Sequence, residues 1–230
     1  MYNQLPWLPT TSYRNPHIRN DNNLLKLTGE GSVSANPDMS TITLGVITEN
    51  ENLTTAQQEN NQKVASVIHS LSALGIQKEN IKTVDYRVEM VYDYENSKQT
   101  LRGYRVIHML QITNNDLART GMIVDTAIKN GANSVTSIDF SVKNPQNYYS
   151  QALALALNNA QAKATALANE MGVKVNIIPI LVQEVSQMPP PMPFQATMFA
   201  KSEAATPIQP GELKITATIH AHFSYFLLQS

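Results

Sequence analysis

The stretch QNYYSQALALALNNAQAKATALANEM, residues 146–171, decides the fold because it predicts one long, alanine-rich helix. Its alanines recur at every fourth position from 152 to 168, and steps of four drift around a helix that turns every ~3.6 residues. A straighter apolar stripe mixes steps of three and four, and it consists of Tyr149, Leu153, Ala156, Ala160, Ala164, Leu167 and Met171. We expect this stripe to pack on a sheet; the alternative is a partner-binding face.

A glycine-containing strand is the predicted counterpart of this helix. Residues 24–35, LLKLTGEGSVSA, alternate between apolar and polar, which predicts a half-buried strand. Gly29 and Gly31 fall on its apolar side, where a missing Cβ favours a bulge or close packing, for example against the alanine face. A phosphate loop is disfavoured because no Gly-Lys-Ser/Thr follows and the next element is a strand. Residues 36–38, Asn-Pro-Asp, predict a turn.

The middle of the chain alternates strands and helices. A strand with Ile42, Leu44 and Val46 inward precedes a helix at 53–74, whose start carries a capping box of Thr54 and Gln57. Strands at 81–94 and 100–113, a helix capped by residue 114 or 115, and a strand at 134–142 follow. We therefore predict an α+β fold: a mostly antiparallel sheet with helices on one face and a ferredoxin-like βαββαβ core. The N-terminal strand, the long helix and two C-terminal strands, 173–185 (interrupted at Pro179) and 213–227, extend this core.

The hairpin of the two middle strands is long for a globular protein. One face of its first strand carries Val84, Tyr86, Val88, Met90 and Tyr92, and one face of its second carries Tyr104, Val106, His108, Leu110 and Ile112. A hairpin of this length often projects from its domain, where it can pair or pack with another subunit.

Composition restricts the class of protein. The 230 residues, 42% hydrophobic, fit one domain over 23–230 after a flexible arm at 1–22. The net charge of −1 disfavours nucleic acid as a partner. No apolar run reaches the ~20 residues of a transmembrane helix, and the first residues do not resemble a secretory signal. We expect a cytoplasmic location, or the cell envelope if a leader has been removed. The absence of cysteine excludes disulfides and thiol catalysis.

Residues 186–211 form a Pro- and Met-rich loop of unusual length. It is either a mobile loop or an arm that packs on a neighbouring subunit, and Trp7 in the N-terminal arm offers a further docking side chain. The candidate oligomer contacts are apolar side chains: Met188, Met192, Phe194, Met198, Phe199 and Trp7.

Candidate chemistry is sparse. His220 and His222 point to the same face of the last strand, but zinc needs three or four ligands and no third is signalled, so an exposed strand face is the simpler interpretation. His108 is interpreted as a satisfied core histidine. No Gly-x-Ser-x-Gly motif is present, and the carboxylate pairs Asp93/Glu95 and Asp85/Glu89 carry no signal of a cleft. Arg102 and Arg105 are expected on opposite faces of their strand. No catalytic residue and no cofactor is predicted.

Several short pieces, taken in order, resemble the SIMPL-domain family. They are Thr28-Gly29-Glu30-Gly31, Pro37-Asp38, Leu74-Gly75-Ile76, Ile81-Lys82-Thr83, Gly103-Tyr104, Asn130-Gly131-Ala132 and the alanine-rich helix ending at Gly172. The resemblance spans about residues 24–225. It implies an α/β domain without established catalytic residues, loosely described signalling, stress-related or cell-surface roles, and in some bacterial relatives ring- or channel-shaped homo-oligomers in the envelope.

The leading hypothesis is a non-enzymatic, self-assembling SIMPL-domain protein with a structural, scaffold or stress-related role. The alternative is a small-ligand or divalent-metal-binding module, with a groove lined by Tyr86, Tyr92 and Tyr104 or a site at His220 and His222. An unrecognised hydrolase is a third hypothesis, supported only by generic Ser and Asp residues.

Overall fold

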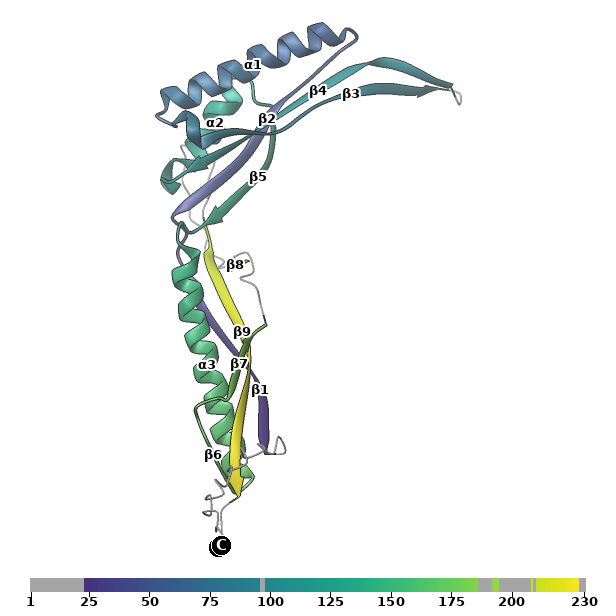
Figure 1. The fold of residues 1–230 in the computed structure, drawn as a ribbon. Coiled ribbons are helices and arrows are strands. Elements are labelled where there is room, and N and C mark those ends of the chain that lie inside the picture. The colour runs from purple at the N-terminus through teal and green to yellow at the C-terminus, as the bar shows by residue number, and fades with distance from the viewer. Residues whose placement is uncertain (1–22, 96–97, 186–191, 195–207, 209, 228–230) are drawn as a thin grey trace, which may run out of the picture.

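The structure, a computed structural model, describes residues 23–95, 98–185, 192–194, 208 and 210–227. The described chain forms two antiparallel sheets, each backed by helix (Figure 1). We call the described residues within 39–142 the upper lobe and those within 24–35 and 145–227 the lower lobe. The predicted α+β class is confirmed, but the strands added to the core form a second sheet instead of lengthening the first. The predicted arm at 1–22 lies outside the described residues.

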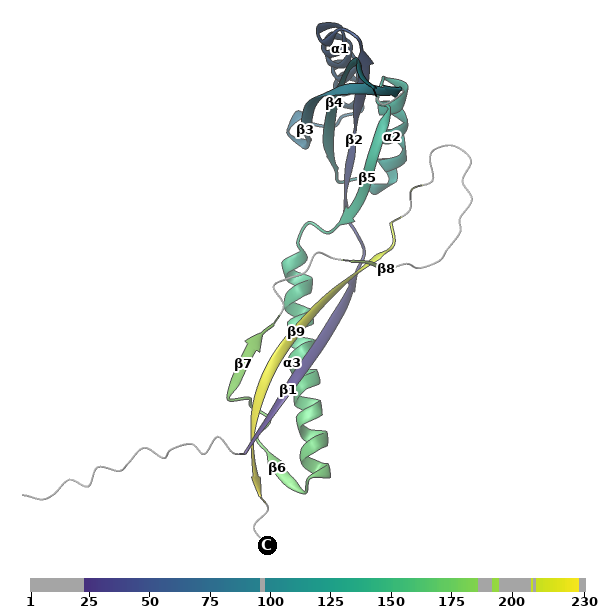
Figure 2. The ribbon, with the colours of Figure 1, turned by 90° about the vertical axis from the view of Figure 1, so that its right-hand side faces the viewer.

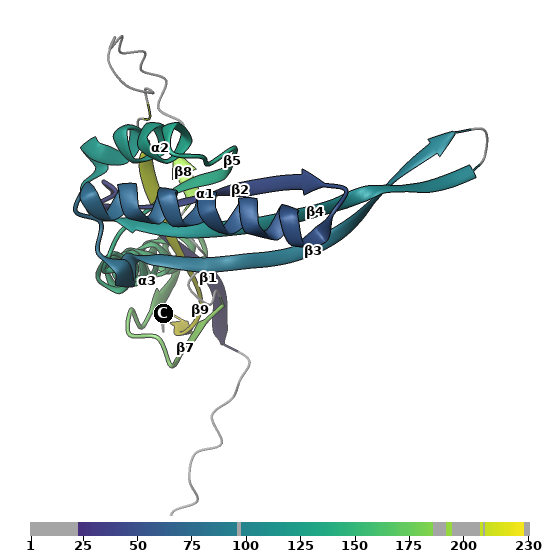
Figure 3. The ribbon, with the colours of Figure 1, turned by 90° about the horizontal axis from the view of Figure 1, so that it is seen from above.

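The upper lobe has the predicted ferredoxin-like order. It contains β2 (Met39–Asn50), α1 (Leu53–Ala73), β3 (Ile81–Glu95), β4 (Lys98–Asn114), α2 (Thr120–Lys129) and β5 (Ser134–Ser141), with short 3₁₀ turns η1 (Lys78–Asn80) and η2 (Leu117–Arg119). The strand order is β3-β4-β2-β5, and all neighbours are antiparallel. Seen from above, α1 and α2 lie over this sheet (Figure 3).

The core of the upper lobe lies between the sheet and α1. Ile42, Leu44 and Val46 are fully buried, as predicted. Asn60 of α1 is also fully buried, and its Nδ2 donates to the carbonyl oxygens of Val46 (3.0 Å) and Val106 (3.2 Å). One polar side chain thus ties the helix to two neighbouring strands, a contact that the sequence did not signal.

The first helix begins differently from the prediction. Its cap is Asn52, whose side chain accepts a hydrogen bond from the Thr55 amide at 3.2 Å. The predicted Thr54–Gln57 capping box is wrong because Thr54 already lies inside the helix. Gly75 ends the helix as predicted, with a φ of 85° that glycine adopts without strain.

The side chain of Asn114 hydrogen-bonds within the turn that precedes the second helix and does not cap the helix itself. Its Nδ2 donates to the Asp116 carbonyl at 2.6 Å, and its Oδ1 accepts from the Asp116 amide at 3.1 Å, so it organises the turn into η2. The helix itself starts at Thr120, and its buried residues include Ile123, Val124 and Ala127, whereas Ile128 is 49% exposed.

The lower lobe is built around one long strand. It contains β1 (Leu24–Ala35), α3 (Pro145–Glu170), β6 (Val173–Val175), β7 (Leu181–Glu184), β8 (Met192–Phe194) and β9 (Glu212–Leu227). β1 pairs with β9 from Leu24↔Ser224 to Ala35↔Leu213, and β6, β7 and β8 pair with its other edge (Figure 2). The strand predicted over 173–185 is interrupted around Pro179, as expected.

Close packing joins α3 to β1. A Cβ on Gly29 would lie 2.1 Å from the Ala156 carbonyl oxygen, and a Cβ on Gly31 would lie 2.2 Å from that of Ala152. The predicted approach of the alanine helix to these two glycines is therefore confirmed.

The buried line of α3 is the winding alanine row, not the straighter stripe. Its members recur every three or four residues: Tyr149, Ala152, Ala156, Ala160, Ala164 and Ala168. Leu167 and Met171, predicted as buried, are 42% and 48% exposed, and Leu153 is only partly buried. The strands beneath the helix twist, so the line of contact winds around the helix with them.

Residues 36–38 connect the lobes instead of reversing the chain, so their prediction as a turn is wrong. Asp38 anchors this connection: its amide donates to the Ser141 carbonyl at 3.0 Å, and its carboxylate accepts from the Lys143 amide at 2.8 Å. The link from β1 to β2 is thereby tied to the link from β5 to α3.

Candidate functional site: the β3–β4 hairpin

The β3–β4 hairpin extends beyond α1 as a two-stranded arm (Figures 1 and 3). Because strand residues alternate between faces, its apolar side chains gather on one face. We call this the apolar face; its members are 37 to 74% exposed and are Tyr86, Val88, Met90, Tyr92, Tyr94 and Leu101. The register confirms the shared face, because Met90 is opposite Tyr104 and Tyr92 is opposite Leu101.

Two irregularities interrupt the pairing of β3 with β4. The register shifts between Thr83 and Asp85, so Val84 falls in the first irregularity, and it shifts again between Val91 and Tyr92. The predicted row from Val84 to Tyr92 is therefore wrong at Val84 only, because Val84 is the extra residue of β3 at the first irregularity; at the second, the extra residue is Arg102 of β4, and β3 keeps its alternation from Tyr86 to Tyr92.

The opposite face of the arm is charged. Arg87 contacts Asp85 (Nη1 to Oδ2, 3.2 Å) and Glu89 (Nε to Oε1, 2.9 Å). These side chains are 36 to 57% exposed, so the pairs contribute little to stability. The candidate carboxylate pair Asp85/Glu89 is therefore bridged by an arginine on an open surface.

Glu49 of β2 lies between two arginines of β4. Its carboxylate accepts from Arg105 Nε at 2.6 Å and from Arg102 Nη2 at 2.7 Å. The prediction that Arg102 and Arg105 point to opposite faces is wrong, because Arg102 is the extra residue of β4 at the irregularity opposite Val91 and Tyr92, so the alternation does not hold there. The hydrogen bond from Arg105 is the largest cause that lowers the pKa of Glu49 below its usual value.

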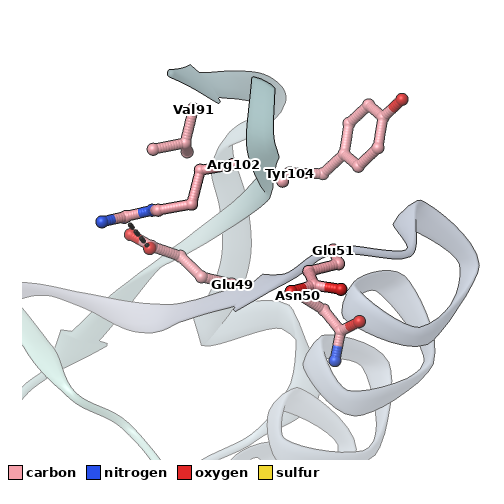
Figure 4. A pocket seen from close by; sticks show the side chains of 7 residues that line it. Glu49, Asn50, Glu51, Val91, Arg102 and Tyr104 are labelled. Carbon is pink, nitrogen blue, oxygen red and sulfur yellow. Dashed lines mark hydrogen bonds and ion pairs between the residues drawn. The ribbon is translucent and has the colours of Figure 1, made fainter. Parts of the chain in front are cut away.

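A hollow of about 180 Å³ lies beside this ion pair at the base of the arm (Figure 4). Its lining includes Glu49, Arg102, Tyr104 and Val91. Gly103 is required there, because a Cβ would lie 2.6 Å from the Asn50 carbonyl oxygen. Of the three tyrosines of the predicted groove, Tyr104 lines this hollow, and Tyr86 and Tyr92 do not.

His108 is half-buried where the arm joins the lobe. Its Nε2 lies 3.0 Å from Thr83 Oγ1 in a hydrogen bond, and its ring packs edge-on against Tyr86 with centroids 5.2 Å apart. Its Nδ1 is buried and has no hydrogen-bond partner among the described residues. The predicted satisfied histidine is thus satisfied at one nitrogen only, and burial lowers its pKa.

The other histidine candidates lie on β9. His220 is exposed, and its Nδ1 lies 3.1 Å from Thr28 Oγ1. Within the part of the chain that the structure describes, no group of three His, Cys, Asp or Glu side chains could hold a metal ion. The structure therefore brings no third ligand from these residues to His220 and His222.

Most predicted oligomer contacts lie outside the described residues: Trp7, Met188, Met198 and Phe199. The backbone of Met192 and Phe194 belongs to β8, which pairs Met192 with Lys214 of β9. Part of the predicted loop is therefore a short strand.

The lower lobe contains a hollow that sequence reasoning missed. It measures about 400 Å³, and its lining is mostly aliphatic: Leu153, Ala154, Leu157, Val182, Ile219 and Glu184. The Glu184 carboxylate accepts a hydrogen bond from the Tyr149 hydroxyl. No local signal could reveal this site, because α3, β7 and β9 contribute to it from distant parts of the chain.

The fold and the arm define an α+β protein with a ferredoxin-like lobe, a helix-backed second sheet and a projecting, two-faced hairpin. The chain belongs to the SIMPL family, a protein family of unknown function (DUF541), whose model matches residues 25–223. In the described residues, we find no helix with the length and apolarity that crossing a membrane requires.

Two groups of relatives support this assignment. The chain is 28% identical over 209 residues to the 26 kDa periplasmic immunogenic protein of Brucella melitensis, covering 86% of this chain and 83% of that protein. It is 31% identical over 162 residues to the uncharacterized protein YggE of Escherichia coli K12, covering 70% of this chain and 66% of that protein. The expectation of a cytoplasmic location is wrong, since a relative that aligns over most of its length is named as periplasmic, which points to the cell envelope.

Proposed function

We propose that this protein is a non-enzymatic, self-assembling component of the bacterial cell envelope with a structural or scaffold role. The observation that carries the proposal is the exposed apolar face of the β3–β4 arm. The name of the Brucella relative supports the envelope location. The stress-related form of the role depends on the family resemblance alone.

The apolar face has the properties of a contact surface. Met90 and Tyr94 are 61% and 74% exposed, and they lie on one continuous face of the arm with Tyr86, Val88 and Tyr92. Scattered exposed apolar side chains are ordinary, but a contiguous group of this kind favours an interaction site. Tyrosine and methionine are also enriched at interfaces, which supports a protein partner.

The contacts of the titratable groups support a non-enzymatic role. Glu49 is engaged by Arg102 and Arg105, and His108 is engaged by Thr83 and Tyr86. A catalytic base needs access to a substrate proton, whereas these groups are used in contacts that organise the base of the arm.

The test is the mass of the full chain in solution, measured by light scattering after size-exclusion chromatography. We expect a multiple of the 25.4 kDa protomer, and we expect Met90→Ser with Tyr94→Ser to shift the distribution towards the protomer. A matched control replaces Ile177 and Ile178 of the lower lobe, which are 55% and 70% exposed, with serine. A wild-type protein that is monomeric at micromolar concentration contradicts the proposal.

A further inference from the structure

We infer that a second copy of this chain binds along β3, with the two β3 strands antiparallel and Val88 opposite Val88 of the partner subunit. The inference rests on the proposed self-assembly and specifies the surface that carries it. The strand order, the irregularities of β3 and its charge pattern support this pairing independently.

The first support is a free sheet edge. β3 is the terminal strand in the order β3-β4-β2-β5, and its ladder partner is β4. In the described part of the chain, no strand pairs with its outer edge. A 15-residue edge strand presents a row of unpaired amide and carbonyl groups, which form a template for another strand.

The second support is the regular segment of β3. The register with β4 is continuous from Asp85 to Val91, between the two irregularities. Val88 is the middle residue of this segment. A two-fold axis at Val88 therefore aligns the whole regular segment with itself and leaves both irregularities outside the pairing.

The third support is charge complementarity. With Val88 opposite its own copy, Arg87 is opposite Glu89 of the partner subunit, and Glu89 is opposite the partner's Arg87. On the apolar face, the same register places Tyr86 opposite the partner's Met90. Opposite charges and apolar pairs directly across an antiparallel ladder both stabilise it.

Neighbouring registers lose this match. A shift of one residue places charged positions opposite apolar ones, because successive side chains alternate between faces. Centring the axis on Arg87 puts Arg87 opposite itself and Asp85 opposite the partner's Glu89, so like charges meet. Centring it on Tyr86 runs the pairing through the irregularity at Thr83 and Asp85.

The symmetry also suits the two-faced arm. A two-fold axis perpendicular to the sheet keeps each face on its own side, so the two apolar faces join and the two charged faces join. The two four-stranded sheets then form one continuous sheet, and both sets of α1 and α2 lie on the same side of it.

A single cysteine at the axis tests the register. The chain has no cysteine, so Val88→Cys introduces the sole thiol. Residues directly opposite in an antiparallel pair have Cα atoms about 4.5–5.5 Å apart, within disulfide range. Val135→Cys is the matched control, since Val88 and Val135 are 40% and 41% exposed and Val135 lies in β5 at the other sheet edge. We expect about tenfold more disulfide-linked dimer from Val88→Cys under mild oxidation.

Charge reversal tests the pairing without a covalent bond. Alone, Arg87→Glu places a carboxylate opposite the partner's Glu89, and Glu89→Arg places a guanidinium opposite the partner's Arg87, so each variant should lose this dimer. In a mixture of the two variants, one chain carries carboxylates at positions 87 and 89 and the other carries guanidinium groups at both positions. Each cross-strand pair in the heterodimer therefore joins opposite charges. We expect heterodimers in the mixture, an outcome that damage within one chain cannot produce.

The outcomes separate the two proposals. If Val88→Cys and Val135→Cys cross-link equally, or if the mixed variants remain apart while the wild type is oligomeric, pairing through β3 is wrong and self-assembly stands. If the wild type is a monomer, both proposals are wrong. Selective cross-linking of Val88→Cys together with recovery in the mixture supports both.

Discussion

Gly29 of β1 and Ala156 of α3 lie so close that a Cβ on the glycine would be 2.1 Å from the alanine carbonyl oxygen. A backbone oxygen cannot move aside as a flexible side chain can. The spacing between helix and sheet in the lower lobe is therefore set by the absence of side-chain atoms at glycine and by single methyl groups at alanine.

Replacing Gly29 with alanine should destabilise the protein. The added methyl group must displace α3 or β1, and overpacking of this kind costs about 1–3 kcal/mol or more. Chemical denaturation followed by circular dichroism measures the change in the free energy of unfolding. Ser32→Ala, at an exposed position of the same strand, is the control. Equal midpoints for both variants would show that the helix is not held at this distance.

Ala160→Leu tests the winding contact line of α3. Ala160 is fully buried, so the larger side chain should cost about 1–3 kcal/mol. Ala162→Leu adds the same atoms at an exposed position of the same helix and should change stability by less than about 0.5 kcal/mol. Similar melting temperatures for the two variants would contradict the assigned face.

Asn60→Ala removes the side chain that joins α1 to two strands. The variant loses hydrogen bonds to the carbonyl oxygens of Val46 and Val106 inside the core, and we expect a loss of about 1–3 kcal/mol. Its exposed neighbour Asn61 supplies the control, because Asn61→Ala changes the same atoms in water. An unchanged midpoint for Asn60→Ala would rule out a stabilising role for the buried amide.

His108 should make stability depend on pH below its ordinary pKa of 6.5. Burial lowers its pKa in the folded state below the ordinary value of 6.5, so the unfolded chain binds the proton more readily. Its contribution is fully present above the unfolded pKa and is lost as pH falls towards the folded pKa. Denaturation at several pH values should show this slope in the wild type and a smaller slope in His108→Gln; equal slopes in the two proteins would contradict the assignment to His108.

Protonation of Glu49 should reduce the stability of the protein at acidic pH. The Arg105 hydrogen bond is the main cause that lowers its pKa below 4.5, so its contribution to stability is present above that pH and is lost as pH falls through the folded value. Arg105→Leu should raise the pKa of Glu49, measured by NMR titration of its side-chain carboxyl. Arg87→Leu is the control, because Arg87 contacts Asp85 and Glu89 instead. No change in Arg105→Leu would contradict the assigned ion pair.

The sequence predicted elements well where periodicity is long and unambiguous. The boundaries of β1 and α3, the split at Pro179 and the approach of the glycines to the alanines followed from local patterns. It failed where a face depends on tertiary twist, as at Leu167, or on a local irregularity, as at Arg102. Alternation in one strand cannot reveal such an irregularity, because it is defined by the partner strand.

The candidate site was only half predictable. Its side chains and the length of the hairpin could be read from the alternating residues, but their exposure could not. Whether Tyr86 or Met90 is buried depends on how far α1 reaches over the sheet, and α1 covers β2 and β4 but leaves these side chains 46% and 61% exposed. The match of Arg87 to Glu89 about Val88 becomes meaningful once β3 is known to be an edge strand.

The helices of the two lobes bury side chains of different size. Beneath α1 the buried contacts are isoleucine, leucine and valine, whereas beneath α3 the helix contributes mostly alanine. Because each alanine removes little apolar area from water, α3 gains less per turn from its packing than α1 does. Amide hydrogens of β1 and α3 should therefore exchange with solvent sooner than those of β2 and β4, so the molecule would open from its alanine-lined end while the ferredoxin-like lobe stays folded.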